Sequence, residues 1–545
     1  MTALTSGTTG RTGVRALVGL ILAVSMTTID QTIVALSAPT IQSQLGLSHD
    51  GIQWAVNAYL LATAAFFLLG GRLADVFGHK RMVMVGIAAF GVTSLLCGLA
   101  PAGEYAEAWL VGARVLQGVS GAIMFPAAIG IVVQSFSREG RGKAMAMFFA
   151  ITGAMTSVGP MAGGYLTAWT WRSIFWVNVP IAIAAMIVVG LSAAPSPRRA
   201  ERIDWVGAVL VALGMGLVVF GFQQASGWGW TSPGVLGALV GGVVFLAAFA
   251  VHQLRTHEPL VNLRVFRDRG FAISSLATMV SSVAFIAVFF FLSVYGQVSL
   301  GLSATLTGVL FLKLFLGFVI ASRFGSSMFD RVGARPVLAL GGALGVVGFG
   351  WLAATVTDLD FDHSAFLNQQ TWPIALAGAG VGFMLSAAST DAVNRAIGAS
   401  YGEVTGITQT VRNYGSALGL AVLGTVLGNV FTSRLTSSFE GFGLPPDQAY
   451  NVTMYILAAF LLGGLICNLL VRPVAERHFT SEAELAAERA RAHERAAATV
   501  LAGEDPARSG GSLALVVLAW LAVGLPLAWG IWTTLTKALP LFRGG

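Results

Sequence analysis

Apolar runs of about 20 residues follow one another along almost the whole chain, and a helix of that length crosses the hydrocarbon core of a bilayer. Only 10% of the 545 residues are charged, whereas a soluble domain carries about 25%. We therefore predict an all-α integral membrane protein with about fourteen spans. The predicted spans lie near residues 14–41, 52–70, 82–100, 108–135, 143–167, 173–193, 203–222, 233–252, 271–297, 304–324, 335–356, 372–390, 404–432 and 450–471.

Basic side chains are concentrated in alternate loops, and this bias sets the orientation because Lys and Arg stay on the cytoplasmic side. With the N-terminus inside, Arg172 and Arg434 are the only basic residues in the outer loops of these spans, which also carry Glu104 and Glu107. We predict a multi-pass protein of the inner (cytoplasmic) cell membrane with a cytoplasmic N-terminus. The loop residues account for the net charge of +7, which is therefore no sign of nucleic-acid binding.

One loop sequence occurs twice. Residues 71–80 are echoed by residues 326–335, with the shared pattern Asp-x-x-Gly-x-basic 255 residues apart. Both copies follow the second span of a group of six. We predict two pseudo-symmetric six-helix bundles, residues 1–200 and 256–472, separated by two linker helices within 201–255. Repeats of this kind place a binding site between the halves, near the midplane of the membrane.

The composition changes after residue 472. Residues 473–511 are rich in Ala, Glu and Arg, and Ser481 with Glu484 forms a capping-box pattern, so we predict a short cytoplasmic polar helix and linker. Residues 512–545 contain an additional apolar run from about Leu513 to Leu535, which either spans the membrane or lies along it.

Asp30 is a lone acid inside the first predicted span. A carboxylate in the hydrocarbon core costs several kcal/mol unless it is paired, protonated or in contact with water. Asp30 is therefore a candidate proton carrier, and the alternative is a structural acid satisfied by a neighbouring helix.

Arg114 is the candidate partner of this acid. It lies roughly 10 Å below the outer end of the fourth span, and Asp30 lies at a similar depth in the first. An arginine there would favour proton release from the acid. Gln117 shares the face of Arg114 by its i+3 spacing. The sequence does not show whether Asp30 and Arg114 are in contact.

The repeated loop is a candidate gate. Glycine allows a close approach or a positive φ, and Asp75 accepts hydrogen bonds from a helix N-terminus or pairs with an arginine. The alternative is an ordinary charged loop. The residues predicted to form the gate are Gly71, Asp75, Gly78, Lys80 and Arg81 in the first copy and Asp330, Arg331, Gly333 and Arg335 in the second.

The fifth span carries small residues and a proline, which allow close helix packing and a bend. Residues 153, 157, 160 and 164 share one helical face. We predict a flexible seam between helices, although ordinary tight packing would use the same residues. The seam residues are Gly153, Gly159, Pro160, Gly163 and Gly164.

Several polar and aromatic residues inside the spans are candidates for lining a substrate cavity. Of the aromatic ones we expect most to face lipid or to pack against other helices. The candidates are Asn57, Tyr59, Gln117, Phe285, Phe289, Tyr295, Gln297, Lys313 and Arg412.

Lys313 and Arg412 differ from the other candidates because both are cations near mid-depth of the second half, where we find no acid at that depth. Two cations facing one cavity would favour an anionic or zwitterionic substrate or a lipid headgroup. Alternatively, they are structural cations bonded to carbonyl groups, or their side chains extend to the interface.

Together these residues resemble the major facilitator superfamily. The Asp75 loop is similar to the signature loop of that family, with Val76, His79 and Ser326 as departures. Residues 114–118 are similar to its fourth-span arginine motif, and residues 153–164 to its antiporter motif, which marks exporters. Residues 30–36 are similar to the first-span motif of the fourteen-span drug:proton antiporter branch. The resemblance covers residues 14–472 and implies proton-driven export by alternating access.

We therefore predict a proton-coupled secondary exporter of hydrophobic or amphipathic small molecules. Its partners would be the substrate, protons and membrane lipids, with no nucleic acid. A P-loop is absent from the sequence, so we expect the proton gradient, without a cofactor, to supply the energy. One alternative is an exporter or exchanger of organic anions or acidic lipids that uses Lys313 and Arg412. Another is a non-transporting sensor or scaffold. An enzyme is not expected, since the sequence has no metalloprotease, nucleophile-elbow or Cys/His pattern.

Overall fold

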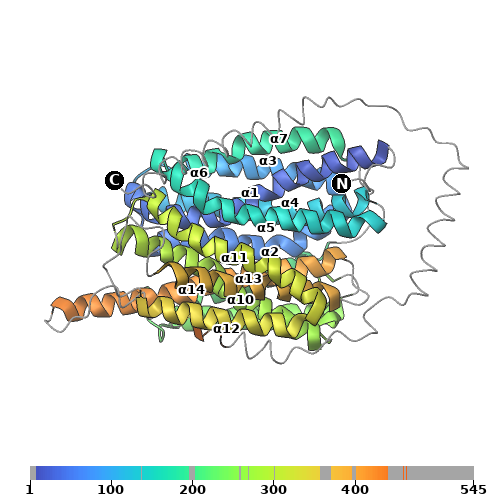
Figure 1. The fold of residues 1–545 in the computed structure, drawn as a ribbon. Coiled ribbons are helices and arrows are strands. Elements are labelled where there is room, and N and C mark those ends of the chain that lie inside the picture. The colour runs from blue at the N-terminus through green and yellow to red at the C-terminus, as the bar shows by residue number, and fades with distance from the viewer. Residues whose placement is uncertain are drawn as a thin grey trace, which may run out of the picture.

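The computed structural model describes residues 8–136, 138–194, 203–256, 259–267, 269–299, 301–355, 370–395 and 401–439, together with residues 458, 459 and 462. Regular structure in these ranges is helical, as predicted (Figure 1). The predicted span 450–471 falls almost entirely outside the described residues. The predictions for residues 473–511 and 512–545 fall wholly outside them.

The first half contains α1 to α7, and two further helices follow it before the second half begins at α10. The helices are α1 (Thr8–Leu45), α2 (His49–Phe77), α3 (His79–Gly98), α4 (Ala106–Ser135), α5 (Arg138–Trp169), α6 (Ser173–Trp176), α7 (Asn178–Ser192), α8 (Trp205–Trp228), α9 (Pro233–Arg255), the 3₁₀ turn η1 (Leu263–Arg267), α10 (Arg269–Val294), the π-helical turn η2 (Tyr295–Ser299), α11 (Ala304–Val332), α12 (Ala334–Thr355), α13 (Thr371–Arg395) and α14 (Tyr401–Phe439).

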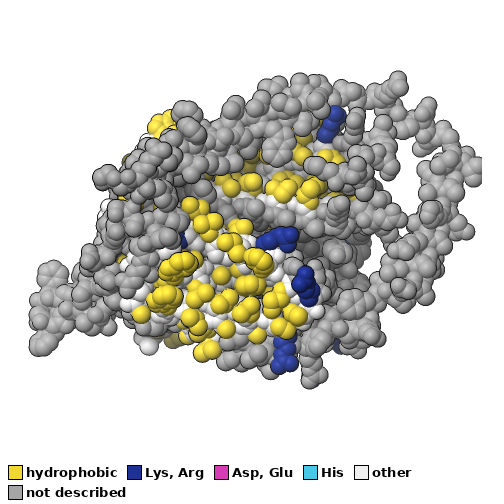
Figure 2. Space-filling view, viewed as in Figure 1, with side chains coloured by type: hydrophobic (Ala, Val, Ile, Leu, Met, Phe, Trp, Pro, Cys, Tyr) yellow, Lys and Arg dark blue, Asp and Glu magenta, His cyan; other side chains and the backbone are white. Residues whose placement is uncertain are grey.

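Every predicted span up to 404–432 coincides with one of these helices within a few residues, except that the span 173–193 is divided into α6 and α7. Within the described residues, ten helical segments are long and apolar enough to cross a membrane. Figure 2 shows the outer surface that this requires. Apolar side chains cover the described face over α11 to α13. Exposed Trp351, near the end of α12, and exposed Trp372, at the start of α13, line the same surface pocket, as in an interfacial aromatic belt.

The two halves repeat one packing scheme. In the first half α1 packs on α5, α2 on α4, and α3 on α4; in the second half α10 packs on α14, α11 on α13, and α12 on α13. Among the described residues, the most extensive contacts between the halves are those of α1 with α10, α2 with α14 and α5 with α11. This arrangement is the one that the duplicated loop predicts, with the interface between the halves running along the middle of the bundle.

The duplicated loops adopt the same turn. Gly78 (φ 93°) ends α2 and precedes α3, and Gly333 (φ 79°) ends α11 and precedes α12. Positive φ strains a residue with a Cβ atom, so the shared glycine of the pattern is explained by the turn itself. Gly71 does not take part in this turn, because it lies inside α2.

The pair α3 and α7 is capped by cations at opposite ends. Lys80 Nζ, near the start of α3, donates to the carbonyl oxygens of Gly190 (3.0 Å) and Ala193 (2.6 Å) at the end of α7. Arg172 Nη1, before α7, donates to the carbonyl oxygens of Gly98 (2.7 Å) and Ala100 (2.8 Å) at the end of α3. Unpaired carbonyls at a helix C-terminus favour a cation, so each helix is fastened to the start of the other.

The linker helices α8 and α9 are joined to each other by Asp204, the N-cap of α8. Its carboxylate accepts hydrogen bonds from Gly207 N (2.8 Å) and Gln253 Nε2 (2.7 Å), and it lies 2.8 Å from His252 Nε2. Burial raises the pKa of the Asp204 carboxyl, but these hydrogen bonds outweigh burial, and the pKa is lowered overall. In turn, α8 packs against α2 and α14, so the linker hairpin contacts both halves.

Candidate functional site: a buried ion pair beside the cavity between the halves

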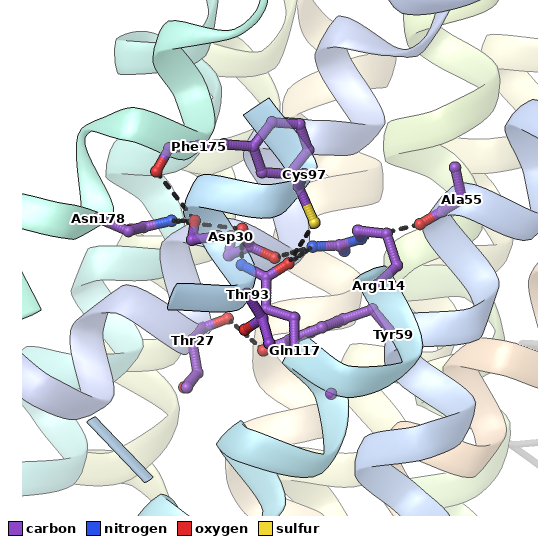
Figure 3. A network of polar contacts seen from close by, with 12 residues as sticks. Thr27, Asp30, Ala55, Tyr59, Thr93, Cys97, Arg114, Gln117, Phe175 and Asn178 are labelled. Atoms are coloured by element: carbon purple, nitrogen blue, oxygen red, sulfur yellow. Dashed lines mark hydrogen bonds and ion pairs between the residues drawn. The ribbon is translucent and has the colours of Figure 1, made fainter. Parts of the chain in front are cut away.

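Asp30 lies in the middle of α1 with an exposed fraction of 0%, and it points into the first half rather than towards lipid (Figure 3). Arg114 of α4 is equally buried, and its Nη1 donates to Asp30 Oδ2. The two residues whose contact the sequence left open therefore form an ion pair inside the helix bundle.

Further donors surround the carboxylate. Gln117 Nε2, one turn along α4, donates to Asp30 Oδ1 (3.1 Å). Asn178 Nδ2, at the start of α7, lies 3.5 Å from the same oxygen and 2.9 Å from Ser94 Oγ of α3. All described partners of Asp30 are thus donors. A carboxylate that only accepts hydrogen bonds is the ionised form, so the arrangement fits a negatively charged Asp30 beside a positively charged Arg114.

Arg114 has further hydrogen-bond partners besides Asp30. Its Nε donates to the carbonyl oxygen of Ala55 (2.9 Å) and its Nη1 also donates to Gln117 Oε1 (2.7 Å). The guanidinium carbon lies 4.3 Å from the centroid of the Tyr59 ring, on α2. Among the described residues its Nη2 has no hydrogen-bond partner, and the ring face below it supplies electrostatic compensation.

A small cavity lies next to this cluster, between the halves. It is lined by residues of α1, α2, α4 and α14, namely Thr27, Thr28, Gln31, Tyr59, Thr63, Phe67, Gly121, Phe125, Gln409, Arg412 and Asn413. Its volume of about 20 Å³ is room for a water molecule and not for a drug-sized ligand. Asp30, Arg114 and Gln117 do not line it, so the ion pair is separated from the cavity in this conformation.

Hydrogen bonds hold the halves together at the end of the bundle where α1 ends. Ser293 Oγ and Gln297 Nε2 both donate to the carbonyl oxygen of Leu36, at 2.6 and 2.7 Å, and Thr40 Oγ1 donates to Gln297 Oε1 at 3.1 Å. Thr305 of α11 donates to the carbonyl oxygen of Gly164 of α5 (3.2 Å). Gln297 therefore lies at this closed end rather than in the cavity.

The predicted gate residues lie at the opposite end of the bundle, where α2 ends. Asp75 lies 3.5 Å from His79 Nε2, one turn further on, so its described partner is this histidine and not an arginine or a helix N-terminus. Lys80 caps α7, as described above. The side chains of Arg81, Arg331 and Arg335 are exposed, and the side chain of Asp330 lies outside the described set.

The predicted seam is a close contact of α5 with two helices. A Cβ atom on Gly159 would overlap Thr32 of α1, one on Gly163 would lie 2.8 Å from Ile33 of the same helix, and one on Gly164 would lie 2.9 Å from the carbonyl oxygen of Ala304 of α11. The glycines thus face both α1 and α11, and not one common face. The surroundings of Gly153 and the side chain of Pro160 lie outside the described set.

Of the nine predicted cavity residues, Tyr59 and Arg412 line the cavity. Arg412 lies 5.4 Å above the ring of Phe285. Phe289 stacks on Phe311, with ring centroids 5.3 Å apart. The remaining candidates lie elsewhere in this conformation: Asn57 contacts Gln223 of α8, Gln117 belongs to the ion-pair cluster, and Tyr295 and Lys313 are buried outside the cavity lining.

The aromatic side chains of α10 and Tyr295 of η2 pack against other helices, which is one of the two outcomes expected for most of them. Phe285, Phe289, Phe290, Phe291 and Tyr295 are all buried, with exposed fractions of 3% or less. The reason is that α10 lies at the centre of the interface, with α1, α13 and α14 packed around it. These rings therefore pack between helices.

Sequence reasoning missed three polar residues of the site. Asn178 is the third side chain on Asp30, and Gln31 Nε2 donates to Asn413 Oδ1 (3.1 Å) across the two halves. All three are amides inside apolar spans. A search for uncharged polar residues in the spans, and not only for charged ones, would have found them.

The comparisons with known proteins agree with this architecture. The family model of the Major Facilitator Superfamily matches residues 20–420. The chain is 34% identical to the puromycin resistance protein pur8 of Streptomyces alboniger, over 84% of this chain and 90% of that protein. It is 33% identical to the cephamycin export protein CmcT of Amycolatopsis lactamdurans, over 84% of this chain and 93% of that protein.

Solved structures show the same fold at low sequence identity. An auto-inhibited peptide transporter of the POT family superimposes with a TM-score of 0.58 at 15% identity, over 85% of this chain and 98% of that one. The family resemblance and the all-helical membrane fold predicted from the sequence are thereby confirmed. This chain belongs to the Major Facilitator Superfamily and is a multi-pass membrane transporter of small molecules, not an enzyme.

Proposed function

We propose that this transporter is a proton-coupled antiporter that exports hydrophobic or amphipathic small molecules across the cytoplasmic membrane, with its N-terminus in the cytoplasm. The observation that carries the proposal is the buried Asp30–Arg114 pair next to the cavity between the halves. The names of the two relatives support the export of antibiotics.

The geometry gives Asp30 a role in coupling. Three donors, Arg114, Gln117 and Asn178, occupy three of the roughly four acceptor sites of the carboxylate, and protonation removes the negative charge that holds Arg114. The Asp30–Arg114 ion pair joins α1 to α4, and α1 packs against the second half at the interface between the halves. Proton binding and a rearrangement at the interface are therefore linked, as coupling of proton and substrate movement requires.

Alternating access fits the pattern of contacts between the halves. With the proposed orientation, the Leu36–Ser293–Gln297 contacts close the outer side. Because the cavity holds about one water molecule, the substrate binds only after the halves separate. The glycines of α5 and the loops at Gly78 and Gly333 lie at the contacts and turns that such a rocking motion uses.

The decisive experiment is transport by the purified protein in vesicles under an imposed pH gradient, with the wild type beside Asp30→Asn. We expect the amide variant to lose substrate uptake driven by the gradient while it still binds substrate. Glu104→Gln, at an exposed position outside the pair, is the matched control. Uptake by Asp30→Asn that remains driven by the gradient would refute the proton role of Asp30.

A second candidate function is the export or exchange of organic anions or acidic lipids. Arg412 is the one charged residue that lines the described cavity, and no acid lines it, which favours a substrate with a negative group. Lys313, the other predicted cation, is buried in α11 but is not part of the lining. Loss of anion transport in Arg412→Ala with intact efflux of a cationic dye would favour this function, and unchanged anion transport would exclude Arg412 from it.

The third hypothesis is a sensor or scaffold that does not transport, and the segment that would dock a partner, residues 473–545, lies outside the described residues. Proton-coupled flux in the same vesicles would dismiss it.

A further inference from the structure

Tyr59 forms part of the boundary between the cavity and the ion pair. On one side Tyr59 lines the cavity, together with Thr27 and Gly121. On the other side its ring contacts the ion pair, because the ring centroid lies 4.3 Å from the guanidinium carbon of Arg114. Its hydroxyl donates to the carbonyl oxygen of Thr27 (3.1 Å), one turn before Asp30 on α1 (Figure 3). Tyr59 and Thr27 thus join α2 to α1 on the cavity side of the acid.

The backbone of Tyr59 is held firmly. Thr63 Oγ1 donates to the carbonyl oxygen of Tyr59 (2.7 Å) and to that of Gly118 (3.3 Å), which ties α2 to α4 at this level. Gly118 approaches the Tyr59 carbonyl so closely that a Cβ atom would lie 2.5 Å from it. Motion at this position is therefore left to the side chain.

The end of the side chain is held more weakly. One hydrogen bond fixes the hydroxyl, and the space beside it is open because residue 121 is a glycine. A Cβ atom there would lie 3.6 Å from the Tyr59 hydroxyl and 3.3 Å from Thr27 Cγ2. A net hydrogen bond contributes about 1 kcal/mol, so the hydroxyl itself adds little to the barrier. The packing of the buried ring against Phe90 and Arg114 is what a ligand or an opening of the cavity has to disturb.

We propose that Tyr59 is a gate between the cavity and Asp30: its closed ring keeps cavity water from the carboxylate, and its displacement when the cavity opens or fills gives protons access to the acid. The inference rests on the proposed function. It adds a positioning residue that makes proton access depend on the state of the cavity. Without such a barrier, protons would exchange at Asp30 in every conformation and the gradient would leak.

The test measures access to Asp30 directly. Purified protein in vesicles reacts with dicyclohexylcarbodiimide, and mass spectrometry follows labelling of Asp30, with buried Asp391 of the second half as the internal reference. We compare the wild type with Tyr59→Phe, which keeps the ring and loses the bond to Thr27, and Tyr59→Ala, which removes the barrier. Proton leak without substrate is recorded in the same vesicles.

We expect labelling of Asp30 and proton leak to rise about 5-fold in Tyr59→Phe, the effect of one lost hydrogen bond, and by more in Tyr59→Ala. The control is Trp54→Ala on the same helix, since the Trp54 ring packs against Phe220 of α8 and is not part of the cavity lining. It should leave both rates near those of the wild type. Gly121→Ala, which fills the space beside the hydroxyl, should lower labelling of Asp30.

Two results would overturn the gate. One is wild-type labelling of Asp30 in both Tyr59 variants, and the other is an equal increase in Trp54→Ala, which would mean general loosening of α2. The Asp30→Asn variant distinguishes a failure of the Tyr59 gate from a failure of the proposed proton-coupled function. If Asp30→Asn abolishes coupling while Tyr59→Ala labels normally, only the gate is wrong; if Asp30→Asn remains coupled, the proton role itself is wrong.

Discussion

The two halves share a packing scheme but place an arginine within the spans in opposite surroundings. In the first half Arg114 is enclosed by helices, paired with Asp30 and bonded to Ala55 and Gln117. In the second half Arg412 lines the cavity between the halves and lies over the ring of Phe285, and no acid is paired with it among the described residues. Duplication has therefore preserved the helix arrangement and not the charge arrangement.

The difference indicates a division of labour. A buried pair carries no net charge and is strongly destabilised when one partner is removed, because the other is left as an uncompensated buried charge. Arg412, at the cavity wall, would leave no described acid unpaired if it were removed. We therefore expect the first half to hold the titrating group, and the second half to hold the group that meets the substrate.

The largest effect should come from breaking the pair. In Arg114→Leu, Asp30 is left buried without its counter-charge, and the free energy of unfolding should fall by about 3–5 kcal/mol. Thermal unfolding in detergent measures the loss. The double variant Asp30→Asn/Arg114→Leu should recover part of it, since no charge then remains. If the double variant is no more stable than Arg114→Leu, the pair is not the source of the effect.

Arg412→Leu should give the opposite pattern and so sharpen the comparison. We expect a change of stability of less than about 1 kcal/mol, since no buried acid is left behind. The affinity for an anionic substrate should fall at least about 10-fold, as a charge-assisted hydrogen bond is worth about 1.5–3 kcal/mol. Binding titrations with an anionic and a neutral substrate separate the two effects. A stability loss as large as that of Arg114→Leu would show that both arginines are structural.

The contacts that close one end of the bundle should have an intermediate effect. Gln297→Leu removes the bonds to Leu36 and Thr40, each worth about 1 kcal/mol, and should raise the population open at this end by about 10-fold or more. Spin labels at exposed Gln44 and Trp372 report the distance between the halves at that end. Thr305→Val, which removes a single bond between α11 and α5, should shift the distribution less.

The smallest effect should come from Asn178, the most distant donor to Asp30. In Asn178→Ala we expect a loss of stability of about 1 kcal/mol, mainly from the shorter bond to Ser94, and retained proton coupling. Substrate-driven proton release in vesicles tests whether proton coupling is retained. Loss of coupling in this variant would mean that Asn178, and not only Arg114, controls the charge on Asp30.

The sequence predicted most of the fold because hydrophobic length and the placement of Lys and Arg are properties of the chain alone. It also identified Asp30, since a single acid in an apolar span is conspicuous, and it placed Arg114 at a similar depth by counting residues. It did not predict which side chains line the cavity. Asn57 and Phe289 are at plausible depths, but the rotation of each helix directs them towards α8 and α11.

Contacts between distant segments were the other limit. Gln31 and Asn413 are separated by 382 residues, and their pairing depends on how the halves meet. The glycines of α5 lie in close contact with their neighbours, yet their division between α1 and α11 depends on the crossing of three helices. Depth along a helix is encoded locally, whereas orientation around it is decided by neighbours.

The reciprocal caps of α3 and α7 have a practical consequence for following the transport cycle. Lys80 and Arg172 each donate two charge-assisted hydrogen bonds, one cation at each end of this pair. Neither helix can therefore slide along the other without breaking such bonds. The pair therefore serves as a rigid reference frame. A fluorophore attached to lipid-facing Ile187 on α7 would report the tilt of this pair, and with it that of the N-terminal half.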